Sequence, residues 1–449
     1  MRQLSPAPVA RAAVRWSLGH ALPSRLLRRA GKQGDLHGRM FIATQEGDPV
    51  ALAGVMAELR GHGSFYKGKY ASVSVENAAV RAMLSSPDAG SFTVGGDDDT
   101  LIGRLQTWAM QDAPLGPLTP PSLLVAEPPD HTRYRKLVSR VFSVRAVEKL
   151  RGRTQEIATG LLGGIDPSSP NDLVATYCSL LPVTVIAEIL GVPERDHELV
   201  LRFGAAAAPS LDLGLSWREF RRVETALREF DQWLGRHLDD LRRNPGDDLL
   251  SQLVAAQEDG VGLTDSELKS TAGLVLAAGF ETTVNLLGNG IALLAGDTSQ
   301  LRLLAESEEL WPNAVDEVLR VDPPVLLTGR VAAADTEVGG VRLRRGSVMV
   351  GLLAGANLDP AIFPEPARFD VARQNAREHV SFSAGRHYCL GAALARMEGD
   401  VGLRTLFERY PDLRLEPGAE RRSTRILRGY EKLPVTLRPS PAVVSSAGQ

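Results

Sequence analysis

The sequence is poor in cysteine, in net charge and in long apolar runs, and each shortage argues against a class of protein. Its 449 residues include only two cysteines, Cys178 and Cys389, which excludes a disulfide-rich secreted scaffold and favours a reducing cytoplasm. The formal net charge is −3, so overall charge does not indicate nucleic-acid binding. No apolar run approaches the roughly 20 residues that a membrane-spanning helix needs, so we expect no integral membrane span.

The N-terminus lacks acidic residues before Asp35 but is rich in arginine. Arg11 and Arg15 interrupt any apolar core of a signal peptide, so that interpretation fails. We interpret residues 1–40 as a basic arm that is solvated, flexible or loosely packed. Peripheral membrane contact stays open as an alternative, through a surface helix that would use Val9, Ala13 and Trp16.

Most of the chain shows apolar residues at the three-to-four spacing of helices, and strand signals are few. The helical segments are 132–163, 172–190, 217–242, 265–295 and 390–409. Val338-Gly339-Gly340-Val341 reads as a hairpin turn, and the β-rich run Val348-Met349-Val350 follows. Without a repeat or a long linker, residues 41–438 are predicted to form a single domain, mainly α with a small β-rich portion. Residues 439–449 are predicted to be a disordered tail.

The most informative stretch is Phe382-Ser383-Ala384-Gly385-Arg386-His387-Tyr388-Cys389-Leu390-Gly391. Two glycines flank the cysteine and allow the backbone to fold tightly and approach a flat ligand closely. A helical pattern starts directly after Gly391, and a helix N-terminus favours a thiolate over a thiol. Such a sulfur would be a strongly electron-donating iron ligand. Cys178, by contrast, sits in an apolar helix and is interpreted as a buried, inert cysteine.

The pattern Phe-x-x-Gly-x-His-x-Cys-x-Gly is expected by chance in roughly one chain in a hundred thousand. It resembles the cysteine loop of the cytochromes P450. The resemblance implies the P450 fold, with haem b (iron protoporphyrin IX) held between the long central helix and the helix after the cysteine loop. It further implies that Cys389 ligates the iron, with Phe382, Gly385 and Gly391 shaping the loop around it.

Three further elements follow the order seen in the P450 family. His131 and Arg135 are four residues apart on one helical face, where the family supplies contacts to the haem propionates. Arg330 and His387 occupy further positions of that kind. Glu317-Val318-Leu319-Arg320 fits the family's Glu-x-x-Arg element, for which we predict a structural role.

The run Ala278-Gly279-Phe280-Glu281-Thr282-Thr283 lies inside a long apolar helix. Gly279 weakens the helix, and a threonine hydroxyl bonding back to the i−4 carbonyl can open a groove for water there. A merely capped or kinked helix is the alternative. Resemblance to the P450 acid–threonine pair makes Glu281 and Thr282 the predicted proton-delivery residues, with Ala278 beside the haem.

The resemblance implies a monooxygenase that inserts one oxygen atom of O2 into a substrate. The chain has neither a Gly-x-Gly-x-x-Gly fingerprint nor a cysteine cluster, so we expect electrons from a separate ferredoxin and its ferredoxin reductase. Arg133, Lys136 and Arg140 share a helical face that is predicted to dock this acidic partner. A solvated basic face is an equally good interpretation of these three residues.

The predicted substrate is a hydrophobic small molecule of the steroid, terpenoid, fatty acyl or polyketide class. The candidate pocket residues are Leu274, Val275, Val325, Leu326 and Leu427. The long loop predicted for residues 92–120 and the segment 206–215 are further candidates. Substrate identity, regiochemistry and oligomeric state do not follow from the sequence.

Two other functions compete with hydroxylation. One is a P450-fold protein with a non-hydroxylating reaction, against which the Glu281-Thr282 pair argues. The other is a haem-binding protein that senses a ligand without turnover. A helical protein without haem would be a third possibility, and it would lack the spectrum of a thiolate-bound iron.

Overall fold

The computed structural model describes residues 6–91, 100–140, 142–255, 257–258 and 261–438. Helices make up most of the described chain, as predicted. The α-helices are α1 (Pro6–Trp16), α2 (Leu22–Lys32), α3 (Leu36–Glu46), α4 (Pro49–Arg60), α5 (Asn77–Ser85), α6 (Leu101–Met110), α7 (Asp130–Ser139), α8 (Val144–Glu148), α9 (Arg151–Gly163), α10 (Leu180–Ile189), α11 (His197–Ala207), α12 (Trp217–Arg243), α13 (Leu249–Ala255), α14 (Asp265–Gly296), α15 (Thr298–Glu306), α16 (Trp311–Val321), α17 (Leu353–Ala356) and α18 (Ala392–Arg409).

The β-rich portion consists of short strands in small sheets. The strands are β1 (Tyr66–Lys67), β2 (Ser72–Ser74), β3 (Ala89–Ser91), β4 (Asn171–Asp172), β5 (Gln257–Glu258), β6 (Val261–Gly262), β7 (Leu327–Ala332), β8 (Thr336–Val338), β9 (Val341–Leu343), β10 (Val348–Leu352), β11 (Arg414–Leu415), β12 (Glu420–Arg421), β13 (Tyr430–Lys432) and β14 (Pro434–Thr436). The largest sheet has the order β1-β2-β10-β7-β3, in which β10 runs parallel to β2 and antiparallel to β7. A three-stranded sheet has the order β11-β14-β4.

The predicted hairpin turn is confirmed. Strands β8 and β9 pair antiparallel, with Val338 opposite Val341. The two residues between them, Gly339 and Gly340, have φ angles of 57° and 78°. Both central positions of the favoured two-residue hairpin turn need positive φ, which glycine adopts without steric cost.

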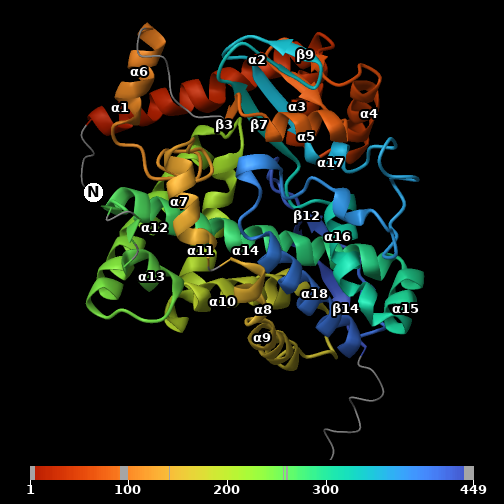
Figure 1. Ribbon diagram of the computed structural model, residues 1–449. Helices are drawn as coiled ribbons and strands as arrows, with labels where there is room; N and C mark the ends of the chain where they lie inside the picture. The colour runs from red at the N-terminus through yellow and green to blue at the C-terminus, as the bar shows by residue number, and fades with distance from the viewer. Residues whose placement is uncertain (1–5, 92–99, 141, 256, 259–260, 439–449) are drawn as a thin grey trace, which may run out of the picture.

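The long helix α14 crosses the middle of the molecule, with α18 beside it and the largest sheet above it in the view of Figure 1. It begins at a capping box in which Thr264 and Glu267 satisfy each other's backbone N–H groups. Its apolar residues join the main hydrophobic core together with residues of α10, α16 and α18. This packing, rather than helix propensity, fixes the course of α14.

Three predicted helices match the structure closely, and two predicted segments are broken. The segments 217–242, 265–295 and 390–409 correspond to α12, α14 and α18, and the segment 172–190 divides into the π-helical turn η2 (Val174–Cys178) and α10. The segment 132–163 divides into α7, α8 and α9, because Ser143 is extended and caps a new helix by accepting from the N–H of Ala146. The predicted loop 92–120 is wrong at residues 101–110, which form α6; residues 92–99 lie outside the described part.

The interpretation of residues 1–40 as a loosely packed arm is also wrong where the structure describes it. Residues 6–32 form α1, the π-helical turn η1 (Ser17–Ala21) and α2, and Ala12 is fully buried. Trp16 donates from Nε1 to the carbonyl of Leu215, so its ring faces protein. Helix α3 runs across residue 40, so no boundary falls there. These packing partners are distant in sequence, which is why the local pattern missed them.

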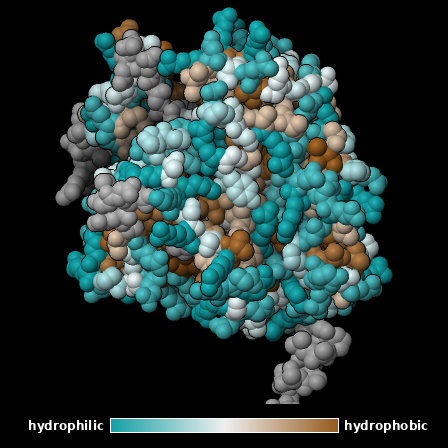
Figure 2. Space-filling model, in the orientation of Figure 1, coloured by the Kyte–Doolittle hydropathy of each residue, from teal (hydrophilic) through white to brown (hydrophobic). Residues whose placement is uncertain are grey.

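The surface of the side shown in Figure 2 is predominantly hydrophilic, with hydrophobic residues scattered over it. Among the described residues, no helix has both the length and the apolarity to cross a bilayer. Scattered apolar residues are normal for a protein surface.

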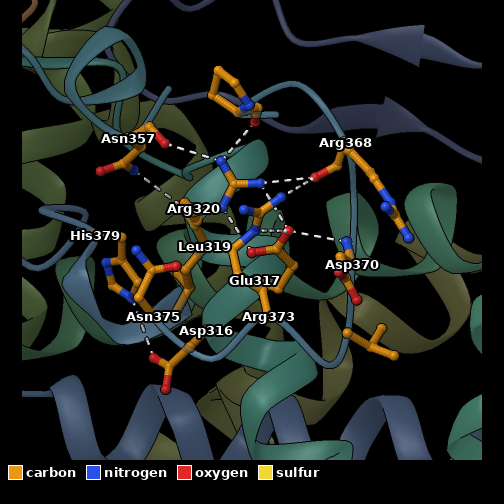
Figure 3. Close-up of polar contacts among 12 residues, drawn as sticks. Asp316, Glu317, Leu319, Arg320, Asn357, Arg368, Asp370, Arg373, Asn375 and His379 are labelled. Atoms are coloured by element: carbon orange, nitrogen blue, oxygen red, sulfur yellow. Dashed lines mark hydrogen bonds and ion pairs between the residues drawn. The ribbon is translucent and has the colours of Figure 1, made fainter. Parts of the chain in front are cut away.

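A buried ion cluster joins α16 to the segment that leads toward Cys389 (Figure 3). Glu317 and Arg320 are fully buried and pair through two contacts of 2.7 and 2.8 Å. Arg320 also donates to the carbonyls of Asn357, Pro366 and Arg368, so its donors are satisfied by backbone as well as by charge. The predicted structural role of the Glu-x-x-Arg element is consistent with this geometry.

The ion cluster gives a stability prediction. The Glu317→Gln variant leaves Arg320 and the neighbouring Arg373 without their shared buried carboxylate. We expect it to lower the free energy of unfolding by about 3–5 kcal/mol, measured by urea denaturation. The matched control is Glu337→Gln, which breaks an exposed 3.8 Å pair with Arg342 and should cost under about 1 kcal/mol. Equal losses in the two variants would contradict the assigned role.

Candidate functional site

The cysteine loop is a tight turn that ends at the N-terminus of α18. Its 3-10 turn, η7 (Gly385–His387), is closed by the Tyr388 N–H, which donates to the Gly385 carbonyl at 3.1 Å. The Cys389 N–H donates to the Phe382 carbonyl at 2.8 Å and brings the two ends of the loop together. Phe382 is buried beneath the loop, where the Arg396 guanidinium lies 4.6 Å from its ring centre. The loop is therefore held by backbone bonds and by one buried ring.

The two glycines of the loop meet different constraints. Gly385 has a φ of 66°, and a Cβ there would lie 2.5 Å from the Leu84 carbonyl oxygen of α5. Only glycine meets both conditions. Gly391 has an ordinary φ of −85°, and no atom lies within 4 Å of the place that a Cβ would take, so the described residues impose no such need on it.

The Cys389 sulfur is enclosed by protein yet reachable from a hollow inside the molecule. Its side chain is exposed, whereas desolvation by the surrounding atoms raises the pKa of its thiol. A side chain that is exposed although protein atoms surround it closely is what the wall of an internal space would present. The Gly391 N–H and the charges of Arg135 and Arg396 act in the opposite direction and favour the thiolate. Cys178 is fully buried and burial raises its pKa strongly, as expected for an inert thiol.

Helix α14 also has residues that are open to the interior. Ala278 is exposed although it lies in the middle of this core helix, and Leu274, one turn earlier, is partly exposed. The Thr282 hydroxyl donates to the Ala278 carbonyl at 2.9 Å. Positions 274, 278 and 282 follow the four-residue spacing of one helical face. That face therefore presents apolar surface and one hydroxyl to open space.

Four predicted cofactor-binding residues gather in one cationic cluster. The rings of His131 and His387 lie 4.5 Å apart, and His387 Nε2 is 2.9 Å from the Ser91 hydroxyl. Arg330 is buried and bonds only to Thr328 and to the Gly329 carbonyl among the described residues. Arg135 donates to the Tyr388 carbonyl at 2.8 Å and so lies beside the cysteine loop.

The electrostatics of this cluster fit an anionic ligand. Burial together with the charge of Arg330 lowers the pKa of His387 to about 4, and burial and Arg135 lower that of His131. Burial also lowers the pKa of Arg330, which has no ion-pair partner within the described ranges. His131 Nε2 is buried without a hydrogen-bond partner in the same part of the chain. An orphaned buried nitrogen and an unpaired buried guanidinium are the donors that carboxylates of a bound group would satisfy.

One acidic residue, Glu127, partly neutralises the positive charge of the cluster and was not predicted from the sequence. Glu127 pairs with Arg386 at 2.7 Å and approaches His387 at 3.5 Å. Although burial alone would raise its pKa, the N–H of Ser91 and these cations lower it. Glu127 is followed by two prolines and precedes His131 by four residues, but no pattern in the sequence marks it as a site residue.

Glu281 does not share the open face with Thr282. It is buried and forms an ion pair with Arg422, which in turn lies 3.9 Å from the exposed Glu431. Burial raises the pKa of Glu281, Arg422 lowers it and Glu431 raises it. No local pattern around Glu281 indicates Arg422, because Arg422 lies far along the chain, next to the hairpin of β12 and β13. The acid–threonine pair is thus two neighbours on different faces, with the acid connected toward the surface.

The predicted pocket residues divide in the structure. Val325 is partly exposed and forms an isolated bridge with Leu427, which is buried. The prediction for Leu326 is wrong, because alternation along the extended chain turns it into the second hydrophobic cluster with residues of α3 and α4. Val275 packs into the main core, one position away from the open face.

The predicted docking face on α7 is only partly available. Arg133 forms an ion pair with Glu267, so its charge is largely compensated. Lys136 and Arg140 are exposed on the same helix region. This finding weakens α7 as the docking face.

A cysteine at a helix N-terminus and a nearby group of buried donors, among which Arg330 has no ion-pair partner in the described ranges, fit a bound haem. Comparison with known proteins agrees. A family model described as Cytochrome P450 matches residues 205–427. The putative cytochrome P450 140 of Mycobacterium tuberculosis is 48% identical over 96% of this chain and 98% of its own length. The vitamin D(3) 25-hydroxylase of Pseudonocardia autotrophica is 41% identical over 73% of this chain and 80% of its own.

Among solved structures, CYP164A2 of Mycobacterium smegmatis superposes with a TM-score of 0.78 at 31% identity, over 89% of this chain and 99% of that one. The chain therefore belongs to the cytochrome P450 family of monooxygenases. Family membership implies a haem-iron cofactor, and the described donors fit one.

The Glu281–Arg422 pair gives a pH-dependent prediction. The Arg422→Met variant leaves a buried carboxylate unpaired and raises the pKa of Glu281 further. Because the folded-state pKa then lies above the unfolded one, stability is lost as pH rises through it. We expect the free energy of unfolding to fall by about 3 kcal/mol at pH 7 and to recover partly toward pH 5.

Two controls sharpen this test. Adding Glu281→Gln to Arg422→Met removes the titrating group, so the extra pH dependence should vanish. Arg414→Met, at an exposed position of β11, should change stability by under about 0.5 kcal/mol. A loss in Arg422→Met that is the same at pH 5 and pH 7 would show that the pair is not electrostatically important.

Proposed function

We propose that the protein is a haem-thiolate monooxygenase that inserts one atom of O2 into a hydrophobic small molecule, with Cys389 Sγ as the iron ligand. The observation that carries the proposal is the Cys389 sulfur itself, exposed yet closely surrounded by protein, where the Gly391 N–H counteracts the burial that raises its pKa. When bound, the haem supplies the activation of dioxygen for insertion into a C–H bond. A cytoplasmic location is part of this proposal.

Residues of this chain would hold the cofactor at its iron and at its two propionates. Cys389 would supply the sulfur ligand of the iron, and the Gly391 N–H would favour negative charge on that sulfur against the effect of burial. His131, Arg330 and His387 supply donors for the propionates, which would satisfy the orphaned His131 Nε2 and the unpaired guanidinium. Binding these carboxylates would raise the lowered pKa of His387.

Proton delivery is assigned to Thr282 and Glu281. The Thr282 hydroxyl lies at the open face and donates its hydrogen bond to the Ala278 carbonyl. Rotation of the hydroxyl would direct the same proton toward the open space. Glu281 receives protons from the surface side, where Arg422 and Glu431 connect it to solvent. Burial keeps its pKa raised, which brings the carboxyl closer to the pKa of a useful proton donor.

The proton role predicts uncoupling in a threonine variant. Thr282→Ala removes the hydroxyl at the open face, so electrons should divert to peroxide while haem binding persists. We expect the yield of product per reduced nicotinamide to fall about tenfold or more, within the range that one proton-transfer group contributes. Thr282→Ser keeps the hydroxyl and should restore most of the yield. Tight coupling in Thr282→Ala would remove Thr282 from the mechanism.

Electrons are proposed to arrive from a ferredoxin at the surface above the cysteine loop. A depression of about 360 Å³ lies there, lined by Arg81, Arg377 and Arg396 together with Phe382 and Tyr388. It adjoins the cysteine loop through Phe382 and Tyr388, and its cations complement an acidic donor. The exposed member, Arg377, shares Asp316 with Arg396, so this one carboxylate compensates only part of the charge of the two arginines.

This donor site is testable with a surrogate ferredoxin. We expect Arg377→Gln to raise the KM for ferredoxin about three- to tenfold without altering the haem spectrum, because rim charges mainly change association. Arg133→Gln is the matched control on α7, where Glu267 compensates the charge, and it should change KM less. A larger rise of the KM in Arg133→Gln than in Arg377→Gln would place the ferredoxin docking site on α7 instead.

The substrate is proposed to be a hydrophobic molecule, because Leu274, Ala278 and Val325 are the open residues near the site. The relative named as a vitamin D(3) hydroxylase supports a steroid-like or similarly apolar compound. The direct experiment is a spectral titration of the haem-loaded ferric protein against steroids, terpenoids, fatty acids and macrolides. A shift from low to high spin with one class supports the proposal. Failure of the purified protein to bind haem at all would overturn it.

A further inference from the structure

Helix α1 bridges two segments that are far apart in the sequence. Arg15 donates to Asp112 at 2.6 Å and to the carbonyl of Ala109, both at the C-terminal end of α6. The same guanidinium donates from Nε and Nη2 to Glu224 of α12, at 2.8 and 2.6 Å. The side chains of Arg15 and Glu224 are only 8% and 5% exposed, so this is a buried contact.

Neighbouring residues of α1 strengthen the same bridge. Arg11 donates to Gln111 at 2.8 Å and its guanidinium lies over the Trp108 ring. On the other side, Trp16 donates to the Leu215 carbonyl at 2.8 Å and packs edge-on against Trp217. Helix α1 therefore contacts α6 through one set of residues and the start of α12 through another. Figure 1 shows α1 beside α6 at the edge of the molecule.

Helix α6 has little hydrophobic anchoring of its own. Among its ten residues, only Gly103 and Ala109 are buried. Leu101, Ile102 and Leu105 are exposed, and Trp108 and Met110 are only partly buried. This limited burial contributes little free energy, so the polar contacts of Arg15 weigh heavily in holding α6 in place.

Both bridged segments lie next to the site. Helix α12 packs on α14 one residue before the open face of α14 begins at Leu274. At this contact a Cβ on Gly273 would lie 3.3 Å from the Phe230 ring. The segment after α6 reaches α12 near Gly116, whose Cβ position is 3.4 Å from Leu227, and then leads to His131. We propose that Arg15 is a positioning residue that ties α6 to α12 beside the open face of α14 and so sets how readily bulky molecules reach that face. This inference rests on the proposed function.

The test measures entry of small and bulky haem ligands into the full-length, haem-loaded protein. Stopped-flow absorbance gives the association rate constants of imidazole and of clotrimazole in wild type and in Arg15→Met. With the bridge broken, the rate constant for clotrimazole should rise about tenfold or more, because the open arrangement becomes more populated. The rate constant for imidazole should change less than about twofold, because a small ligand needs little opening.

The matched control is Arg29→Met on the exposed face of α2, which should leave both rate constants unchanged. An unchanged clotrimazole rate in Arg15→Met, or an equal rise for imidazole, would overturn the inference. Wild type that shows no azole spectrum would instead overturn the proposed function, so the two failures are distinguishable.

A second measurement does not depend on haem. Hydrogen exchange should speed up in Arg15→Met at the amides of α6 and the first turn of α12, but not at those of α10. If Arg15→Met does not fold, Arg15→Lys takes its place, since it keeps the charge but cannot make all four contacts. It should give a smaller rise at the same amides. Unchanged α6 exchange in the folded variant would contradict the bridge.

Discussion

The position of Cys389 depends on two adjacent buried carboxylates of α16. Glu317 fixes the segment before the cysteine loop through Arg320 and its backbone contacts (Figure 3). Asp316 reaches the other side, because it accepts from Arg396 of α18 at 2.7 Å and contacts His379 at 3.2 Å. Helix α16 thereby holds both the entry to the loop and the helix that follows it. These two acids touch no open face, yet the geometry of the sulfur depends on them.

Helix α14 performs three tasks because its faces meet different surroundings. Ala278 and Thr282 face the hollow, Glu281 faces Arg422 and the surface hairpin, and Thr283 is buried with its hydroxyl on the Gly279 carbonyl. A rotation of about 100° per residue places neighbours in such different environments. Thr282, Thr283 and Glu281 can remain in this apolar helix, since each has a local hydrogen bond or a charge partner.

The sequence was sufficient where chemistry and conformation are local. The helix that begins directly after Gly391 and the hairpin at Gly339 were predicted correctly, because short-range patterns set a helix N-terminus and a turn. It was insufficient where the partner is distant: nothing near Glu281 points to Arg422, and nothing near Arg15 points to Glu224. Leu326 was misassigned because hydrophobicity alone does not tell a pocket wall from a core position.

The account depends most directly on the sulfur of Cys389 as the iron ligand, and one spectrum tests it. The haem-loaded protein is reduced under carbon monoxide and its Soret band is recorded for wild type, Cys389→Ala and Cys178→Ala. We expect the far-shifted band of thiolate-bound iron in wild type and in Cys178→Ala, and its absence in Cys389→Ala. The same shifted band in Cys389→Ala would contradict the assignment.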